Sequence, residues 1–365
     1  MMQTFTKFWT IPPGTLDMPA SEQAVTEAAL LLRQGGIVAF PTETVYGLGA
    51  DATRTEAVGR VFEAKGRPSD NPLIVHIADP SQLAAFVDAD AVGEAERRLM
   101  AAFWPGPLTV VLPVRPGALS PLVTAGLTTV GVRIPDHPLA LALLRRANVP
   151  VAAPSANRSG KPSPTSAQHV ADDLAGRIDG LLDGGTTGVG VESTVVRVDA
   201  GALHVLRPGG VTRQQLAAAL PELPIRDATA ADAEVPRAPG MKYAHYAPQG
   251  RLTVVQPAQP ADRSAVRDYI RAQLRAAREA GERSGVLTFD EHVHDFAAEA
   301  DVVLSYGPLG APEQAAQRLY DALRAFDAAE AACILAEAVP EAGGGIGEAV
   351  MNRLRKAAGH RIVFV

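Results

Sequence analysis

Apolar and polar positions divide the chain into two stretches of alternating strand and helix patterns. In the first stretch, short apolar runs bounded by Gly, Pro or polar residues predict strands at 37–40, 73–77, 108–113, 129–134, 149–153, 180–183, 194–198 and 203–206. Helical spacing predicts helices at 21–34, 91–103, 138–147, 165–175 and 212–220, and a capping box formed by Thr53 and Glu56 predicts the start of another. So many strands interleaved with helices predict one α/β domain over residues 1–220, with a large mixed twisted sheet and flanking helices.

The second stretch follows a change in composition. Residues 221–250 contain five prolines and show no sustained periodicity, which is typical of a linker. Beyond them, strand patterns at 252–255, 285–289, 302–306, 334–336 and 362–365 alternate with amphipathic helix patterns at 265–280, 312–326 and 347–357. This regular alternation predicts a smaller, parallel, Rossmann-like α/β domain over residues 251–365.

Composition and charge narrow the classes of protein and partner. Hydrophobic residues make up 47% and charged residues 20% of the chain, which excludes wholesale disorder. The formal net charge is −6, whereas a protein that coats nucleic acid is normally basic, so any contact with RNA is expected to be local. The N-terminus has no signal-peptide pattern, and no apolar run approaches the roughly 18 residues of a membrane span. We therefore expect a soluble cytoplasmic protein with no membrane partner.

The single cysteine also excludes some classes of protein. Cys333 cannot form an intramolecular disulfide or a thiolate metal site alone, so a disulfide-stabilised secreted domain is excluded. Its apolar surroundings predict a buried structural thiol.

Two polar segments in the first half of the first domain adjoin predicted strands. Thr42-Glu43-Thr44 comes directly after the strand at 37–40, where open α/β sheets place ligand sites, although a solvated turn would also show such residues. Lys65 and Arg67 begin a loop that Pro68 and Pro72 restrict. A lysine point charge beside a planar guanidinium suits phosphate oxygens. A solvated basic loop is the alternative for this motif taken alone.

Two more segments lie in the second half of the first domain. Ser155-Ala156-Asn157 follows the strand at 149–153, and its small side chains would let a nucleotide approach while hydroxyl and amide groups bond ribose or phosphate oxygens. Ser163 fits the same site, but helix capping and turn formation would explain it as well. A glycine-rich run precedes Ser193, and Arg207 follows the next hairpin. None of the four segments is a P-loop, a zinc motif or a nucleophile elbow, so elementary chemistry predicts only an anion-binding site.

Taken in this order, the four segments resemble the threonylcarbamoyl-AMP synthase family, the YrdC-like enzymes. The match runs over about residues 23–220 and includes the family's paired motif, Lys-x-Arg at Lys65 and Arg67 with Ser-x-Asn at Ser155 and Asn157. Each piece is short, but the ordered set is specific. Residues 239–248 and 347–354 resemble the linker and C-terminal domain of the longer, two-domain form, so the resemblance covers nearly the whole chain.

The resemblance implies a nucleotidyltransferase reaction in which L-threonine, bicarbonate and ATP give threonylcarbamoyl-AMP and pyrophosphate. The product would supply the threonylcarbamoyl modification of the adenosine beside the tRNA anticodon, through downstream proteins that transfer the group to tRNA. The threonine amine can take up bicarbonate to give a carbamate, whose oxygen attacks the α-phosphate, so no protein nucleophile is required. Positioning and charge stabilisation are left to the protein, with Mg2+ held mainly by phosphates and water and with no metal site of protein side chains.

The family's functional residues can be placed on this chain one by one. Lys65 and Arg67 are the expected catalytic residues. The implied ATP site comprises Arg67, Asn71, Thr129, Ser155, Asn157, Ser163, Arg207 and, from the linker, His245. The implied threonine site comprises Thr44, His76, Arg133, Ala153 through its backbone, and Ser193. Within it, the planar fork of Arg133 suits the carboxylate of the amino acid.

Three alternatives stay open. The linker, with His245 and Tyr246, is expected to act as a lid over the ATP phosphates, and the competing interpretation is a plain tether. A carbamoyltransferase that matures hydrogenases carries a similar domain, but it would bring Cys-x-x-Cys pairs, whereas this chain has one cysteine. An RNA-binding module of the same fold, without synthase activity, would bind tRNA through a basic face in a salt-sensitive way. A weak tRNA contact would also fit the synthase.

Overall fold

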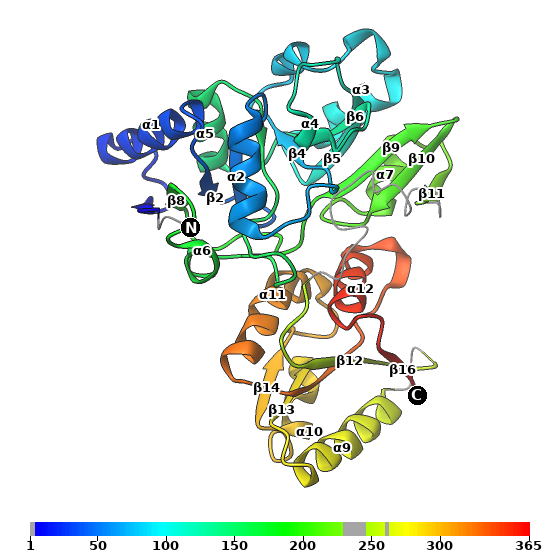
Figure 1. The fold of residues 1–365 in the computed structure, drawn as a ribbon. Helices are drawn as coiled ribbons and strands as arrows, with labels where there is room; N and C mark the ends of the chain where they lie inside the picture. Colours follow the sequence, from blue (N-terminus) through cyan, green and yellow to red (C-terminus); the bar gives the residue numbers. More distant parts are fainter. Residues whose placement is uncertain (1–3, 229–245, 260–262) are drawn as a thin grey trace. The chain divides into compact units, whose positions relative to one another are not determined.

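The computed structural model describes residues 4–228, 246–259 and 263–365, and the chain forms two compact units (Figure 1). The first unit comprises Met1–Ser159 and Ser163–Tyr243, and the second comprises Gly160–Pro162 and Ala244–Val365. The predicted fold class, a large mixed sheet followed by a smaller parallel sheet, is confirmed. Of the expected linker, residues 229–245 lie outside the described residues.

Eleven strands of the described residues form one mixed sheet in the first unit. They are β1 (Lys7–Thr10), β2 (Val38–Phe40), β3 (Gly47–Asp51), β4 (Ile74–His76), β5 (Leu108–Pro113), β6 (Thr129–Arg133), β7 (Val151–Ala152), β8 (Gly180–Asp183), β9 (Thr194–Asp199), β10 (Ala202–Arg207) and β11 (Ile225–Asp227). Their order across the sheet is β1-β8-β2-β3-β7-β4-β6-β5-β9-β10-β11. Each of the eight predicted strands is present, whereas β1, β3 and β11 were not predicted.

The helices of the first unit are α1 (Pro19–Arg33), α2 (Thr55–Lys65), α3 (Glu94–Phe103), α4 (Pro121–Thr124), α5 (Pro138–Ala147), α6 (Ala167–Leu174) and α7 (Arg213–Ala219), with short 3-10 helices at Pro80–Ala85 and Ala89–Ala91. The predicted capping box is wrong. Helix α2 begins at Thr55 without a side-chain cap, because the amide and hydroxyl of Thr53 both donate to Asp51 Oδ1, at 2.9 and 2.7 Å.

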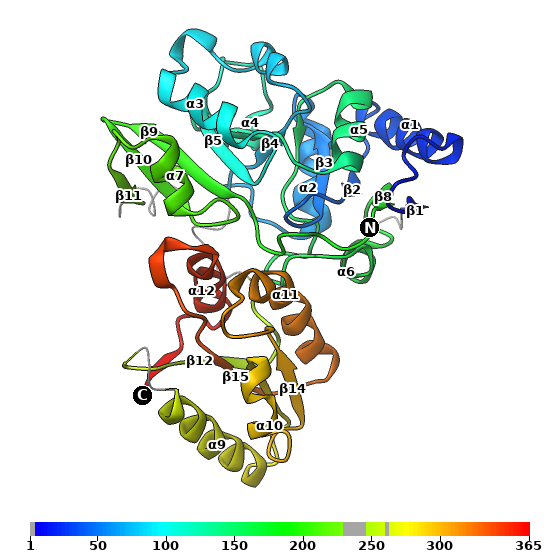
Figure 2. The same cartoon turned by 180° about the vertical axis from the view of Figure 1, so that it is seen from behind.

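Helices cover both faces of the part of the sheet that contains β2 (Figure 1, Figure 2). On one face, α1 and α5 bury Leu32 and Leu143 against Val38. On the other face, α2 and α6 pack against Ile37 and Ala39. Alternate residues along β2 therefore point into two different cores, which explains why this strand is apolar throughout.

The neighbouring part of the sheet, β4-β6-β5-β9-β10, is different. On one face, α3 and α7 join a core that includes Val110 and Val132. On the opposite face, the buried apolar cluster is Ile74, Val111, Val195 and Leu206, and no helix of the described first unit contributes to it. Strand alternation and the observed registers place one row of side chains on this second face, from His76 through Arg133, Thr109 and Val195 to Arg207. Three of these five positions belong to the predicted site.

The second unit has a five-stranded parallel sheet in the order β14-β13-β15-β12-β16. Its strands are β12 (Arg251–Gln256), β13 (Ser284–Thr288), β14 (Val302–Ser305), β15 (Cys333–Glu337) and β16 (Ile362–Phe364), and its helices are α9 (Ser264–Glu279), α10 (Val293–Phe296), α11 (Pro312–Ala328) and α12 (Ile346–Ala357), with 3-10 turns at Asp290–His292 and Ala342–Gly344. The five predicted strands and three predicted helices are all present. Cys333 is buried at the start of β15, as predicted.

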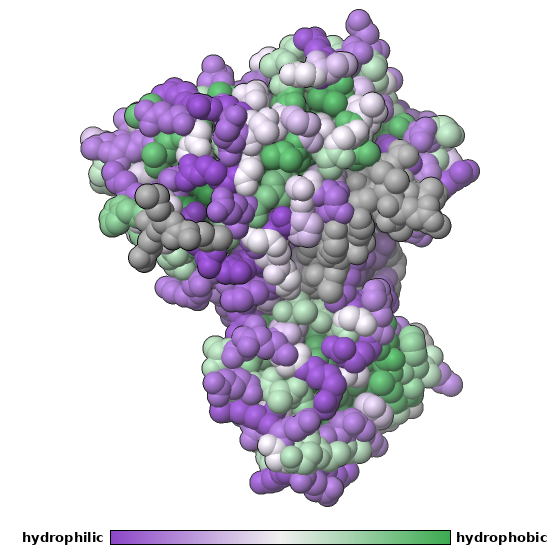
Figure 3. Space-filling model, in the orientation of Figure 1, coloured by the Kyte–Doolittle hydropathy of each residue, from purple (hydrophilic) through white to green (hydrophobic). Residues whose placement is uncertain are grey.

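Hydrophilic and hydrophobic residues are interspersed over the face of the molecule shown in Figure 3. Within the described parts of the chain, every helix is too short or too polar to cross a membrane.

Candidate active site

The predicted site residues of the first unit form two adjoining groups. We call Lys65, Arg67, Asn71, Ser155 and Asn157 the Lys65 group, and Thr44, His76, Arg133, Ser193 and Arg207 the Arg133 group. The groups meet where the loops after β2 and β7 run side by side. There Gly47 and Ser155 form an isolated β-bridge, and the Ala156 amide donates to Tyr46 O at 2.8 Å. Segments that lie about a hundred residues apart in the sequence thus share one site.

Lys65 holds one of these loops in place. It stands in the last turn of α2, which Gly66 ends in the left-handed conformation with φ 62°. Its side chain is 2% exposed, and Nζ donates to Ser155 O at 2.5 Å and to Asn157 O at 2.6 Å. Burial lowers the pKa of Lys65 well below its usual value, and the charge of Arg67 adds to this while that of Asp173 opposes it. Lys65 therefore acts as a clamp on the backbone of the Ser-x-Asn motif.

Asn71 is the least satisfied residue of the Lys65 group. Its side chain is 1% exposed, and neither Oδ1 nor Nδ2 has a hydrogen-bond partner among the described atoms. An unpaired buried polar group costs about 1–3 kcal/mol, so such a side chain normally binds a ligand or an ordered water. Beside it, Arg67 is partly exposed and reaches the carbonyl oxygens of Asn71 and Pro72 at 3.4 Å. Across the group, Ser155 Oγ donates to Asn157 Oδ1 at 2.6 Å.

Arg133 is the centre of the second group. It ends β6 and is buried, Nη1 donates to Thr44 Oγ1 at 2.9 Å, and Nη2 forms an ion pair with Glu43. Thr42 Oγ1 lies 2.7 Å from Thr44 Oγ1 and fixes that hydroxyl. Arg133 Nε and Glu43 Oε1 have no hydrogen-bond partner among the described atoms. A buried guanidinium with an unused donor is suited to a carboxylate.

His76 lies beside Arg133 in the parallel register of β4 and β6. It is 4% exposed, its Nδ1 lies 3.3 Å from Ile74 O, and its ring stands edge-on to Phe40 at 6.2 Å between centroids. Burial, and then the charge of Arg133, lower the pKa of His76 to about 3. The imidazole is therefore neutral at physiological pH. In the neutral ring one nitrogen is a donor and the other an acceptor, and the backbone carbonyl groups of Ile74 and Val151 both interact with the ring.

Ser193 is held from two neighbouring strands. Arg207 donates to Ser193 O from Nε at 3.2 Å and from Nη2 at 2.9 Å, and its Nη2 also donates to Ser193 Oγ at 3.1 Å. Thr109 Oγ1 lies 2.8 Å from Ser193 Oγ. The preceding residue, the buried Glu192, accepts a hydrogen bond from Ser163 Oγ at 2.6 Å. This contact brings Ser163 to the Arg133 group.

Among the described residues, neither Thr129 nor Ala153 has a side-chain hydrogen bond to either group. Thr129 begins β6, opposite Pro113 of β5 and at the other end of the strand from Arg133. The Ala153 amide donates to Ile74 O at 2.9 Å. His245 lies outside the described residues. Tyr246 is described, and it is buried in the second unit with its ring 5.2 Å from that of Tyr320.

Three residues of the site were missed by sequence reasoning. Glu43 and Glu192 stand inside two of the polar segments, but nothing in the sequence shows that one pairs with Arg133 and the other with Ser163. His137 is the N-cap residue of α5, and its Nδ1 is buried without a hydrogen-bond partner among the described atoms. Burial lowers the pKa of His137, against the opposing charges of Glu43 and Asp136. Its flanking prolines predict only a turn.

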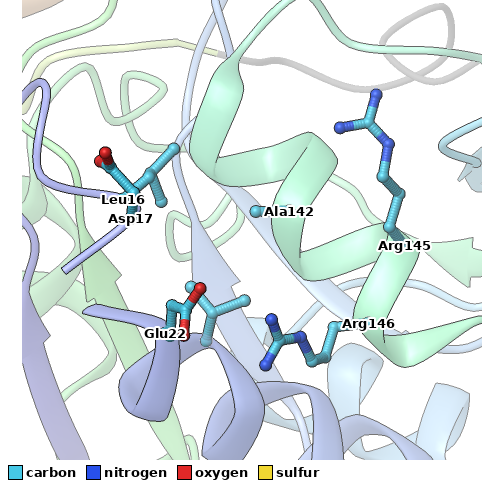
Figure 4. A pocket seen from close by; sticks show the side chains of 7 residues that line it. Leu16, Asp17, Glu22, Ala142, Arg145 and Arg146 are labelled. Carbon is cyan, nitrogen blue, oxygen red and sulfur yellow. The ribbon is translucent and has the colours of Figure 1, made fainter. Parts of the chain in front are cut away.

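Among the residues that the structure describes, no group of three or more His, Cys, Asp or Glu side chains could hold a metal ion. A surface hollow of about 450 Å³ lies between α1 and α5, where Glu22 faces Arg146 (Figure 4). Its lining residues are Leu16, Asp17, Glu22, Val25, Ala142, Arg145 and Arg146, and none of them is a predicted site residue. The Lys65 and Arg133 groups hold the predicted site residues, and we take them as the candidate active site.

Two family models match the chain. The Sua5, YciO and YrdC model, described as "Telomere recombination", matches residues 30–209, and a model described as "Threonylcarbamoyl-AMP synthase, C-terminal domain" matches residues 211–359. Curated relatives named threonylcarbamoyl-AMP synthase match end to end. The Bacillus subtilis protein is 49% identical over 98% of this chain and 99% of its own length. The Pyrococcus abyssi protein is 45% identical, over 94% and 96%.

A solved structure is similar over the same extent. The crystal structure of P. abyssi Sua5 complexed with L-threonine covers 99% of this chain and 100% of its own, with 42% identity and a TM-score of 0.88.

Proposed function

The chain belongs to the threonylcarbamoyl-AMP synthase family, and we propose that it forms threonylcarbamoyl-AMP and pyrophosphate from L-threonine, bicarbonate and ATP. One structural observation supports this activity for the chain itself. The two halves of the paired motif, some 90 residues apart, meet through the two hydrogen bonds of Lys65 with Ser155 and Asn157, beside a buried guanidinium suited to an amino acid. The product would serve the threonylcarbamoyl modification of tRNA.

The Arg133 group supports binding of threonine. The guanidinium of Arg133 would bind the carboxylate, with Thr44 beside it. The neutral ring of His76 offers an acceptor to the hydroxyl or amino group, since it does not titrate near physiological pH. Ser193 and the carbonyl of Ala153 would complete the site. A site built to hydrogen-bond a substrate hydroxyl discriminates against analogues that lack it, so we expect valine to be a poor substrate.

The Lys65 group supports binding of ATP. The unsatisfied amide of Asn71 and the partly exposed Arg67 provide donors for phosphate or ribose oxygens, together with Ser155 and Asn157. We also propose that ATP contacts Thr129, Ser163, Arg207 and His245. In the reaction, a carbamate oxygen bonds to the α-phosphorus and the bond to pyrophosphate breaks, with Arg67 stabilising the charge of the phosphates. Lys65, whose ammonium is bonded to two carbonyl oxygens, would act by holding the Ser155–Asn157 loop in its productive shape.

Cofactor, partners and location follow from this chemistry. We propose that Mg2+ arrives with ATP and stays bound to phosphates and water, where it would neutralise phosphate charge. The product is a reactive mixed anhydride, so we propose that downstream transfer proteins receive it in the cytoplasm. We keep the linker, with His245, as a proposed lid.

The direct test is pyrophosphate release by the purified protein with ATP, Mg2+ and bicarbonate, and with threonine, serine, valine or no amino acid. We expect release that requires both threonine and bicarbonate. Asn71→Ala should raise the KM for ATP by about 10-fold, from the loss of one to two hydrogen bonds to a charged group. Glu94→Gln, an exposed change on α3, is the matched control. Release that is indifferent to threonine would disprove the proposal. Salt-sensitive tRNA binding with no release would identify an RNA-binding module instead.

A further inference from the structure

The first chemical step leaves a proton that the assigned residues do not take. An ammonium and a bicarbonate give a carbamate, one water and one proton. The nitrogen lone pair forms the N–C bond, and the electron pair of the breaking C–O bond leaves with hydroxide. Two protons leave the nitrogen, one of which converts that hydroxide to water, while the other needs an acceptor. Because His76 has a pKa of about 3, it is too weak a base for this task.

We propose that Glu43 and His137 are the proton-accepting pair for the amino group of the amino-acid substrate, an inference that rests on the proposed function. Glu43 receives the proton from the nitrogen, and His137 passes it to solvent.

Glu43 is placed by its contact with Arg133. Its side chain is 12% exposed, Oε2 pairs with Arg133 Nη2, and Oε1 has no hydrogen-bond partner among the described atoms. An α-amino acid that binds Arg133 through its carboxylate carries its amino group only one carbon away. The nitrogen of the bound amino acid therefore lies near the carboxylate of Glu43, which pairs with the same guanidinium of Arg133. The substrate carboxylate also competes for Arg133, which frees Glu43 to bind the ammonium.

His137 is the second buried group of this corner with an unused atom. Its Nδ1 has no hydrogen-bond partner among the described atoms, and the charges that face it are Glu43 from the loop after β2 and Asp136 from its own turn. The ring packs beside the same loop, since a Cβ placed on Gly184 would lie 2.9 Å from Pro41 Cγ and 3.4 Å from His137 Cε1. Burial lowers the pKa of His137, so its ring is neutral at physiological pH. It is also partly exposed, which opens a route to water.

A merely structural role for Glu43, orienting Arg133, makes a different prediction. Loss of orientation would weaken threonine binding equally at every pH and would slow the reaction in both directions. Loss of a proton acceptor would lower kcat, and the deficit would shrink as rising pH supplies more unprotonated amine from solution. It would also spare ATP formation from threonylcarbamoyl-AMP and pyrophosphate, because that step moves no amine proton.

The test measures pyrophosphate release between about pH 6.5 and 9.5 for wild type, Glu43→Gln and His137→Asn, with Glu94→Gln as the matched control. Near pH 7 we expect kcat to fall at least about 100-fold in Glu43→Gln and about 10-fold in His137→Asn, within the range of general base catalysis. Both deficits should shrink at high pH. ATP formation from threonylcarbamoyl-AMP should stay within about threefold of wild type.

Two results would overturn the inference. One is a deficit that is independent of pH and equal in both directions, and the other is normal kcat in both variants. If Glu43→Gln fails to fold, His137→Asn decides alone, since the native Nδ1 makes no hydrogen bond with described atoms and asparagine caps helices well. Wild-type protein that releases no pyrophosphate would refute the proposed function itself, which keeps the two failures apart.

Discussion

Replacing His76 with asparagine should make the first unit less sensitive to acid. His76 is 4% exposed, and its pKa is about 3 in the folded protein against 6.5 for an ordinary histidine. Between these two values the unfolded chain binds a proton that the folded chain does not. The free energy of unfolding therefore falls as pH falls through this window. Asparagine does not titrate and keeps an amide near the position of Nδ1, so the variant lacks this contribution.

The magnitude follows from the two pKa values. Near pH 7.5 both states are mostly neutral, and the contribution of His76 is close to zero. Near pH 5 the unfolded state is favoured by RT ln(1 + 10^1.5), which is about 2 kcal/mol. Because pH 5 lies well above the pKa of His76 in the folded protein, the size of this effect depends only on the pKa of His76 in the unfolded chain. We therefore expect wild type to lose about 2 kcal/mol more than His76→Asn between pH 7.5 and pH 5.

Urea denaturation followed by tryptophan fluorescence can isolate this effect. The two tryptophans, Trp9 and Trp104, both lie in the first unit, so the signal reports the unit that contains His76. Val132→Ala is the control, since it removes a buried methyl pair on the adjacent β6 without removing a titratable group. Its pH dependence should match wild type. The explanation fails if wild type and His76→Asn lose the same free energy to within about 0.5 kcal/mol, the usual spread of additive effects.

Three other changes test the site. Lys65→Ala should lower the free energy of unfolding by about 2–5 kcal/mol in the same urea assay, because it leaves a cavity and two buried carbonyl oxygens unpaired. Gly209→Ala should lower it by at least about 2 kcal/mol and abolish pyrophosphate release, because a Cβ there would lie 2.3–2.4 Å from backbone atoms of residues 192–194. Arg133→Lys should raise the KM for threonine about 10-fold or more, with little change for ATP, because lysine cannot form a two-pronged bond to a carboxylate.

Each of these changes has a control and a contrary outcome. Glu63 is exposed on the same helix as Lys65, so Glu63→Ala should change the free energy of unfolding by no more than about 0.5 kcal/mol. Equal losses of stability in Glu63→Ala and Lys65→Ala would contradict the role of Lys65 as a clamp on the Ser155–Asn157 loop. Gly310→Ala is the control for Gly209→Ala, because a Cβ at position 310 would meet nothing within 4 Å. A fully active Gly209→Ala would show that the backbone of residues 192–194 does not exclude a Cβ at position 209. Equal rises in KM for threonine and ATP in Arg133→Lys would show that Arg133 does not select the amino acid.

Much of the fold was readable from the sequence because its strands are short apolar runs between Gly, Pro and charged residues. The limits of β5, β8 and α5 agree with prediction to the residue. Strand β3 was missed because Gly47 and Gly49 hide its periodicity. The reason lies in packing, since a Cβ on Gly49 would lie 2.8 Å from Val151 Cγ1 and 2.9 Å from Phe40 Cε1. Edge strands β1 and β11 are short and partly exposed, so they carry little apolar signal.

The site was readable only in part. The family motif identifies Lys65 with Ser155 and Asn157, but it does not show that the ammonium binds backbone carbonyls. The pairing of Glu43 with Arg133 joins residues 90 positions apart, and no local pattern encodes such a contact. The roles given to individual residues at ATP and threonine stay predictions until the variants are measured. The roles given to His245 and to the linker also stay predictions.

The order of strands in the large sheet also bears on how the chain is made. Lys7 of β1 pairs with Gly180 of β8, and Ala50 of β3 pairs with Ala152 of β7. A ribosome adds roughly 5–20 residues per second, so β1 waits roughly 10–35 seconds after its own synthesis before its partner exists. During that interval Phe8, which is half exposed even in the finished sheet, has no neighbouring strand. Strand β1 therefore stays an unpaired edge until β8 has been synthesised, and an unpaired edge is a site for aggregation or for binding by a chaperone.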